Sequence, residues 1–155
     1  MPKSGFRPTM PVDGTVGAVL GVILLSLMFL GVTFWNGFPV IFYDTGAYVL
    51  EGLGHVFLVE RAPVYADLLF LAGGHFSLWP IIIVQALLTA YIILEVSRTE
   101  VPGLTLRGLV GIGAVLILLT GIGWYVGQVE PDCMTPLVIL GCWLLLFRSH
   151  RLGKI

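Results

Sequence analysis

Acidic side chains stand at two places where an uncharged run of the sequence ends. The first is Asp44, in the stretch NGFPVIFYDTGAY, and the second is Asp132, in GQVEPDC, where Glu130 accompanies it. A carboxylate can take a proton from a hydroxyl group as a general base, and several carboxylates together can hold a divalent cation. The structural alternatives are a helix cap for Asp44 and a solvated loop acid for Asp132. The two stretches form one site only if the elements between them bring both loops to the same side.

The composition indicates that these elements are helices in a membrane. Of the 155 residues, 57% are hydrophobic and 11% are charged, whereas a soluble domain carries roughly 25% charged residues. The bilayer is therefore the expected solvent, and we expect an all-α integral membrane protein that forms a single module over residues 1–155. The apolar run after the basic N-terminal segment is too long for a signal peptide, and it predicts a retained first span.

Four apolar segments are expected to span the membrane, with a long outer loop between the first two. The expected spans are residues 15–35, 79–94, 108–127 and 134–147. The outer loop, residues 36–78, is expected to hold two short helices in the membrane interface, over residues 45–53 and 63–72. Pro63 suits the first turn of the second helix, and the pair of glycines at 73 and 74 ends it.

The distribution of charge predicts the orientation. With both termini in the cytoplasm, every Lys and Arg except Arg61 lies on the cytoplasmic side, as the positive-inside rule requires. Both acidic stretches then face the outer compartment, and we expect Asp44 and Asp132 to converge there as one acidic site. The sequence argues against a proton-driven transporter or an ion channel, because such proteins carry ionisable residues within their spans. Here the one such residue is Glu95, at the end of the second expected span, and Arg98 can neutralise it.

Arg61 and the histidines are further candidates for this outer face. A guanidinium binds phosphate oxygens through two parallel hydrogen bonds, so Arg61 is a candidate anchor for an anionic ligand. The alternative is a surface salt bridge with the nearby Glu60 or Asp67. His55 and His75 would add metal ligands to the two aspartates, although their scattered spacing is more typical of hydrogen-bonding residues in the interface. No basic aromatic patch indicates nucleic acid as a partner.

Four stretches carry a resemblance to a known superfamily. In chain order they are GFPVIFYDTGAYV, ERAPVYADLLFLAG, SLWPIIIVQALL and GWYVGQVEPDCMTPLVILG. They resemble the N-terminal part of bacterial membrane glycosyltransferases of the GT-C superfamily, and most closely its uncharacterised bacterial members. The resemblance extends from about Trp35 to Leu146. Such enzymes have many more spans than four, which leaves open whether the chain is part of a larger enzyme or a small protein that keeps the first module.

The resemblance implies transfer of a sugar from a polyprenyl-phosphate donor on the outer face of a bacterial inner membrane. It implies catalytic roles for Asp44, as general base or substrate anchor, and for Asp132, which would help to bind the donor or a divalent cation. The substrate-binding residues that it implies are Arg61, Tyr48, Glu130 and Tyr65. A divalent cation is the implied cofactor, with Asp44 and Asp132 as its best candidate ligands.

Two functions of other classes remain compatible with the sequence. The first is a non-catalytic integral membrane subunit, which would pack against larger membrane proteins through its GxxxG patterns at Gly17–Gly21 and Gly123–Gly127. The second is a lipid-binding accessory protein, which would hold an isoprenoid or acyl chain in a groove between the surface helices and the spans. The first predicts that Asp44→Asn and Asp132→Asn leave function intact while Gly17→Leu or Gly123→Leu disrupts assembly, and the second predicts binding without turnover.

Overall fold

The computed structural model describes residues 10–54, 58, 61 and 63–149, and this part of the chain is helical with no named strand. Two candidate site residues lie outside the described part, His55 and Glu60. So do four of the basic residues that predicted the orientation, which are Lys3, Arg7, Arg151 and Lys154. The helices are α1 (Thr15–Phe29), α2 (Gly31–Asn36), α3 (Thr45–Gly54), α4 (Pro63–Leu71), α5 (Trp79–Glu100), α6 (Leu106–Leu119), α7 (Ile122–Gly127), the 3-10 helix η1 (Pro131–Cys133) and α8 (Met134–Phe147).

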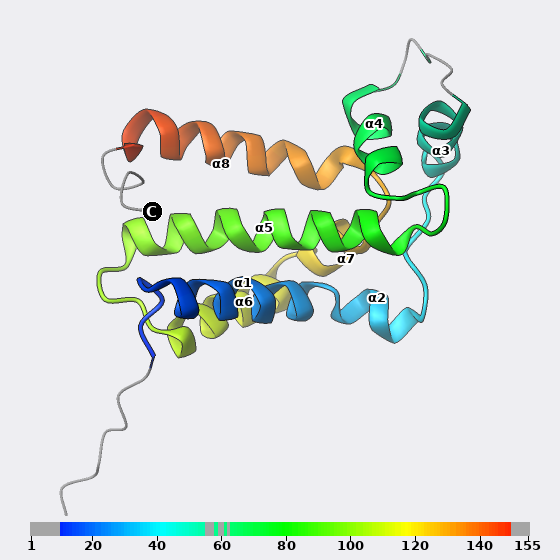
Figure 1. Ribbon diagram of the computed structural model, residues 1–155. Helices are drawn as coiled ribbons and strands as arrows, with labels where there is room; N and C mark the ends of the chain where they lie inside the picture. The colour runs from blue at the N-terminus through cyan, green and yellow to red at the C-terminus, as the bar shows by residue number, and fades with distance from the viewer. Residues whose placement is uncertain (1–9, 55–57, 59–60, 62, 150–155) are drawn as a thin grey trace, which may run out of the picture.

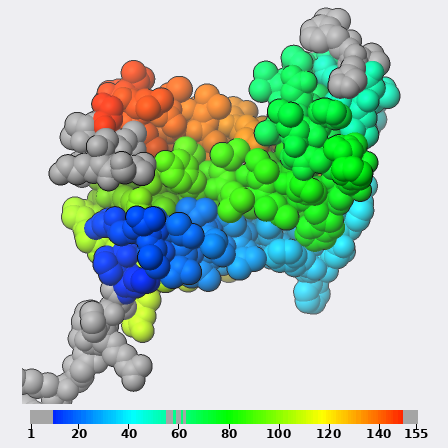
Figure 2. Space-filling model, viewed as in Figure 1, coloured from blue at the N-terminus to red at the C-terminus, as the bar shows by residue number. Residues whose placement is uncertain are grey.

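The four longest helices lie side by side and alternate in direction (Figure 1). Helix α5 packs against α1 and α8, and α6 packs against α1. Helices α3 and α4 pack on each other at the end of the bundle where α5 begins, and the space-filling view shows this pair projecting from that end (Figure 2). The connections that carry Asp44 and Asp132 both lie at this end of the bundle (Figure 1).

The expected all-helical fold is confirmed, and α8 has the expected bounds, but two of the expected spans are interrupted. Leu30, with ψ 0°, separates α1 from α2, although the backbone hydrogen bonds Leu30 N to Ser26 O and Phe34 N to Leu30 O continue through the break. The second break lies at Thr120, between α6 and α7, where the threonine hydroxyl forms one hydrogen bond to each of the two helices. Thr120 Oγ1 donates to Leu116 O at 2.5 Å and accepts from Ile122 N at 3.3 Å.

Helix α5 is longer than expected because its charged residues are neutralised. The expected end was residue 94, but the helix continues to Glu100. Arg98 Nη1 donates to Glu95 Oε1 at 2.7 Å, and Arg98 Nη2 also donates to Val12 O. Among the described helices, α5 alone is long and apolar enough to cross a membrane by itself; α1, α6 and the η1–α8 segment are apolar but shorter.

The glycines of both GxxxG patterns are used inside the chain. A Cβ on Gly17 would lie 2.1 Å from Pro11 O, and one on Gly127 would lie 2.1 Å from Thr33 Oγ1. Gly21 faces the side chain of Leu109 in the same manner. These glycines allow the helices of this chain to approach one another, so a partner protein would have to use other surfaces.

Candidate functional site

Backbone hydrogen bonds join the two acidic stretches. Val40 N donates to Gly127 O at 2.9 Å, and Val129 N donates to Val40 O at 3.0 Å, which forms an isolated parallel bridge between Val40 and Gln128. Thr45 Oγ1 adds a hydrogen bond to Val129 O at 3.1 Å. The segment after α2 therefore lies directly beside the segment after α7.

Asp44 forms an ion pair with Arg61. Arg61 Nη1 donates to Asp44 Oδ2 at 2.5 Å, and the two side chains are 30% (Asp44) and 23% (Arg61) exposed. This contact raises the pKa of Arg61. The sequence offered Glu60 or Asp67 as partners of Arg61, and the partner found is Asp44, because the fold brings the start of α3 to the segment before α4. The carboxylate of Asp44 points to Arg61, and no hydrogen bond from it caps a helix among the residues described.

Two tyrosines form the wall behind this ion pair. The guanidinium carbon of Arg61 lies 5.8 Å from the ring centroid of Tyr48, a cation–π distance. The Tyr48 ring meets Tyr65 edge to face, with centroids 5.1 Å apart. Burial raises the pKa of both hydroxyl groups. The Tyr48 hydroxyl lies near the Arg61 side chain, whereas the Tyr65 hydroxyl is buried and is bonded to another helix.

Gln85, which the sequence did not single out, holds these elements together. Its side chain is fully buried in α5. Tyr65 Oη donates to Gln85 Oε1 at 2.5 Å, while Gln85 Nε2 donates to the carbonyl oxygens of Val126 at 3.1 Å and Gln128 at 2.8 Å. The signal available from the sequence was a lone amide within an apolar run, because such side chains usually bond across helices.

Glu130 lies close to both other acids. Its side chain is 5% exposed, and its Oε1 has no hydrogen-bond partner among the described residues. Burial raises the pKa of Glu130, and the negative charges of Asp132 and Asp44 raise it further. The structure therefore places these three acids within electrostatic range of one another, and we refer to Asp44, Glu130 and Asp132 as the acid cluster.

The residues described do not fit a resident metal ion. No group of three or more His, Cys, Asp or Glu side chains among them could hold one. His75 lies against the aromatic rings of Phe70 and Phe76, with centroids 5.6 and 3.9 Å away. The expected pairing of Asp44 with Asp132 as metal ligands also conflicts with the ion pair that Asp44 makes with Arg61.

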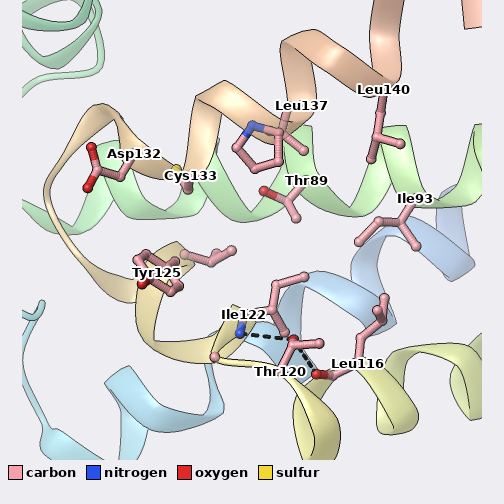
Figure 3. A pocket seen from close by; sticks show the side chains of 13 residues that line it. Thr89, Ile93, Leu116, Thr120, Ile122, Tyr125, Asp132, Cys133, Leu137 and Leu140 are labelled. Atoms are coloured by element: carbon pink, nitrogen blue, oxygen red, sulfur yellow. Dashed lines mark hydrogen bonds between the residues drawn. The ribbon is translucent and has the colours of Figure 1, made fainter. Parts of the chain in front are cut away.

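A groove of about 510 Å³ begins at the acid cluster and follows α8. Asp132 and Cys133 lie at one end, and Leu140 and Ile93 at the other (Figure 3). The wall between them is apolar apart from the hydroxyl groups of Tyr125, Thr89 and Thr120, and the two threonines donate to backbone carbonyls of the preceding helical turn. The lipid-binding alternative predicted a groove between the surface helices and the spans. This one instead lies within the bundle, between α5, α8 and the segment where α6 meets α7.

No family model, curated protein or solved structure matches this chain. The described fold and site define an all-helical protein with one helix of membrane-spanning length. A carboxylate–guanidinium pair and two further acids lie at one end of its bundle. Any narrower assignment rests on the motifs and on the chemistry of these groups.

Proposed function

We propose that the chain is an inner-membrane protein of four spans, with cytoplasmic termini and the acid cluster on the outer face. The surface of the long helices supports this topology. On α1, for example, Val16, Val19 and Leu27 are 62%, 53% and 51% exposed, and on α8 Leu145 and Leu146 are 66% and 75% exposed. Polar side chains such as Gln85 are buried instead, and this distribution suits a hydrocarbon solvent.

The interrupted helices are long enough when each pair counts as one span. Residues 15–36 and 106–127 would each rise about 33 Å at about 1.5 Å per residue, against a core of about 30 Å. A short break is tolerated where hydrogen bonds such as those of Thr120 satisfy the backbone. Helix α8, with 14 residues, would require η1 and local thinning of the bilayer to complete its crossing.

We further propose a GT-C-like glycosyltransferase activity that takes a sugar from a polyprenyl-phosphate donor at the outer face. The chain would act alone or as the N-terminal module of a larger enzyme. The observation that carries this proposal is the Asp44–Arg61 ion pair at the end of an apolar bundle. An ion pair there combines a candidate base with a candidate phosphate ligand, and a polyprenyl chain keeps its phosphate at that depth.

The ion pair suggests how donor binding would prepare the base. A donor phosphate would compete with Asp44 for the Arg61 guanidinium, because a phosphate accepts two parallel hydrogen bonds from it. Asp44 would then be available to accept the proton of the acceptor hydroxyl. As that oxygen attacks the anomeric carbon, the bond from this carbon to the phosphate oxygen breaks, and Arg61 stabilises the departing phosphate. Tyr48, which lies against Arg61, would position the donor, and the buried Tyr65 would hold the Tyr48 ring in place.

Three substitutions test this proposal. Membranes that contain Asp44→Asn, Arg61→Met or the control Asp67→Asn would be assayed with a panel of radiolabelled polyprenyl-phosphate sugars. Asp44→Asn should lower the rate by about 100-fold or more, the usual contribution of a general base. Arg61→Met should raise the KM for the donor. Transfer by Asp44→Asn at the rate of the Asp67→Asn control would rule out Asp44 as the base.

The groove favours a second candidate, a lipid-binding accessory protein. An apolar groove of about 510 Å³ is within the size range of ligand sites. This function predicts a bound chain without turnover, and it predicts that Asp44→Asn has no effect. The hypothesis of a non-catalytic subunit loses one supporting argument, because the GxxxG glycines that it expects to contact a partner pack within the chain instead.

A further inference from the structure

We propose that the groove binds one hydrocarbon chain of a membrane lipid whose head group carries a primary amine, held at Asp132. The proposal concerns binding alone, so it stands or falls separately from sugar transfer. Its starting point is the shape of the groove, which is apolar along α8 and has its one charged lining residue at the outer end (Figure 3). This is the shape of a site for a single-chain amphiphile.

In the proposed four-span topology, on which this step rests, the groove runs in the direction of the lipid chains. Asp132 and Leu140 are eight positions apart, which corresponds to about 12 Å along a helix. Helix α8 packs against α5 and η1, and Leu137 and Leu140 face the groove from one side while Ile93 and Leu116 face it from the other (Figure 3). A chain in this groove would lie parallel to α8, with its head at the acid cluster.

The apolar wall by itself gives little selectivity. Lipid tails are as apolar as leucine, so transfer of a chain from the bilayer into the groove involves almost no hydrophobic driving force. Thr89 and Thr120 add no selectivity, because both hydroxyl groups donate to backbone carbonyls. Which lipid occupies the groove must therefore depend on the contact that its head group makes with Asp132.

The charges around Asp132 favour a cationic head. Asp132 is exposed, and no hydrogen bond or ion pair to its side chain is present in the described part of the chain. The charged groups close to Glu130, two residues before Asp132, are Asp132 itself, Asp44 and Arg61, and Arg61 is already paired with Asp44. An ammonium group would complement the remaining negative charge, whereas an anionic head would be repelled. A bound metal ion would favour an anionic head group instead, but the described residues include no group of three or more potential metal ligands.

Photolabelling with matched probes tests the proposal. Three alkyl diazirines of equal length, ending in a primary amine, an alcohol or a phosphate, would be added to the full chain in phosphatidylcholine nanodiscs. We expect the amine probe to label the peptides that contain Leu116, Leu137 or Leu140 about ten-fold more than the phosphate probe does. Asp132→Asn should abolish this difference, while Asp132→Glu and the exposed control Asp67→Asn should keep it.

A second variant tests the location. Leu137→Trp would fill the groove, and it should reduce labelling by all three probes without changing the circular dichroism spectrum. Equal labelling by amine and phosphate in the wild type would overturn the proposal, as would an amine preference that survives Asp132→Asn. A preference for the phosphate probe that requires added Mg²⁺ would also overturn it, and would indicate an anionic lipid held through a metal ion.

Discussion

Replacing Gln85 by Leu should destabilise the end of the bundle where α5 begins more than any other single polar substitution in α5. The side chain is fully buried and makes three hydrogen bonds, one to Tyr65 and two to the carbonyls of Val126 and Gln128. Leu has a similar volume, so the change removes hydrogen bonds without opening a large cavity. At about 1 kcal/mol for each partner left unpaired, we expect a loss of about 2–4 kcal/mol.

Tyr65→Phe removes one of the same three hydrogen bonds, so its expected cost is about 1 kcal/mol. The two substitutions should be non-additive. In the double variant the Tyr65–Gln85 hydrogen bond is lost only once, which predicts a coupling energy of about 0.5–1 kcal/mol. This coupling distinguishes the specific contact from a general weakening of the fold.

The assay is reversible unfolding of the purified chain in mixed micelles by increasing amounts of dodecyl sulfate, followed by far-ultraviolet circular dichroism. Gln128→Leu is the matched control, because its side chain makes no hydrogen bond to any described residue. It should change the free energy of unfolding by less than about 0.5 kcal/mol. The reasoning is refuted if Gln85→Leu costs no more than Gln128→Leu, or if the costs of Gln85→Leu and Tyr65→Phe simply add.

Three further predictions concern the acids, the glycines and a cysteine. Burial raises the pKa of Glu130 above the ordinary 4.5; the unfolded chain therefore releases this proton first as the pH rises, and stability should fall from about pH 4.5 up to the folded pKa. Glu130→Gln should flatten that part of the stability profile, and an unchanged slope would contradict the assignment. Gly17→Ala should cost about 1–3 kcal/mol of unfolding free energy because its Cβ meets a backbone oxygen, whereas Gly111→Ala, with nothing within 4 Å, should be neutral or slightly stabilising. Cys133 is buried, so in a Cys142→Ser background N-ethylmaleimide at pH 8 should modify no thiol until the protein is denatured, as mass spectrometry would show.

The bounds of a helix could be predicted from the sequence where residues next to its ends determine them. Helix α8 begins and ends as expected because its apolar run is bounded by Pro131 on one side and Arg148 on the other. The break at Thr120 was not expected, because a threonine in an apolar run gives no sign of whether its hydroxyl will cap a helix or bond back to the preceding turn. The end of α5 depends on a contact with Val12, which is distant in the sequence.

The site was predictable in its location and only partly in its pairings. Charge asymmetry placed Asp44 and Asp132 on one side. The connections that carry them lie at the same end of the bundle (Figure 1), and both carboxylates are within electrostatic range of Glu130. The partner of Arg61 was missed because Asp44 is 17 residues away, and an ion pair at that separation depends on how α3 and α4 pack. Gln85 was missed for a related reason, since its three partners lie on other elements.

The parallel bridge between Val40 and Gln128 has a consequence for biosynthesis. During translation the segment that contains Asp44 is made long before its partner, because 88 positions separate the two bridge residues. Contacts between such distant segments form late, after the loop between them has closed. A nascent chain that has so far delivered only α1 to α6 would have its helices in place while Thr45 still lacks its acceptor at Val129. This end of the bundle should therefore assemble only after Val129 has left the ribosome, and ribosome-bound chains with C-terminal extensions of increasing length would reveal that moment.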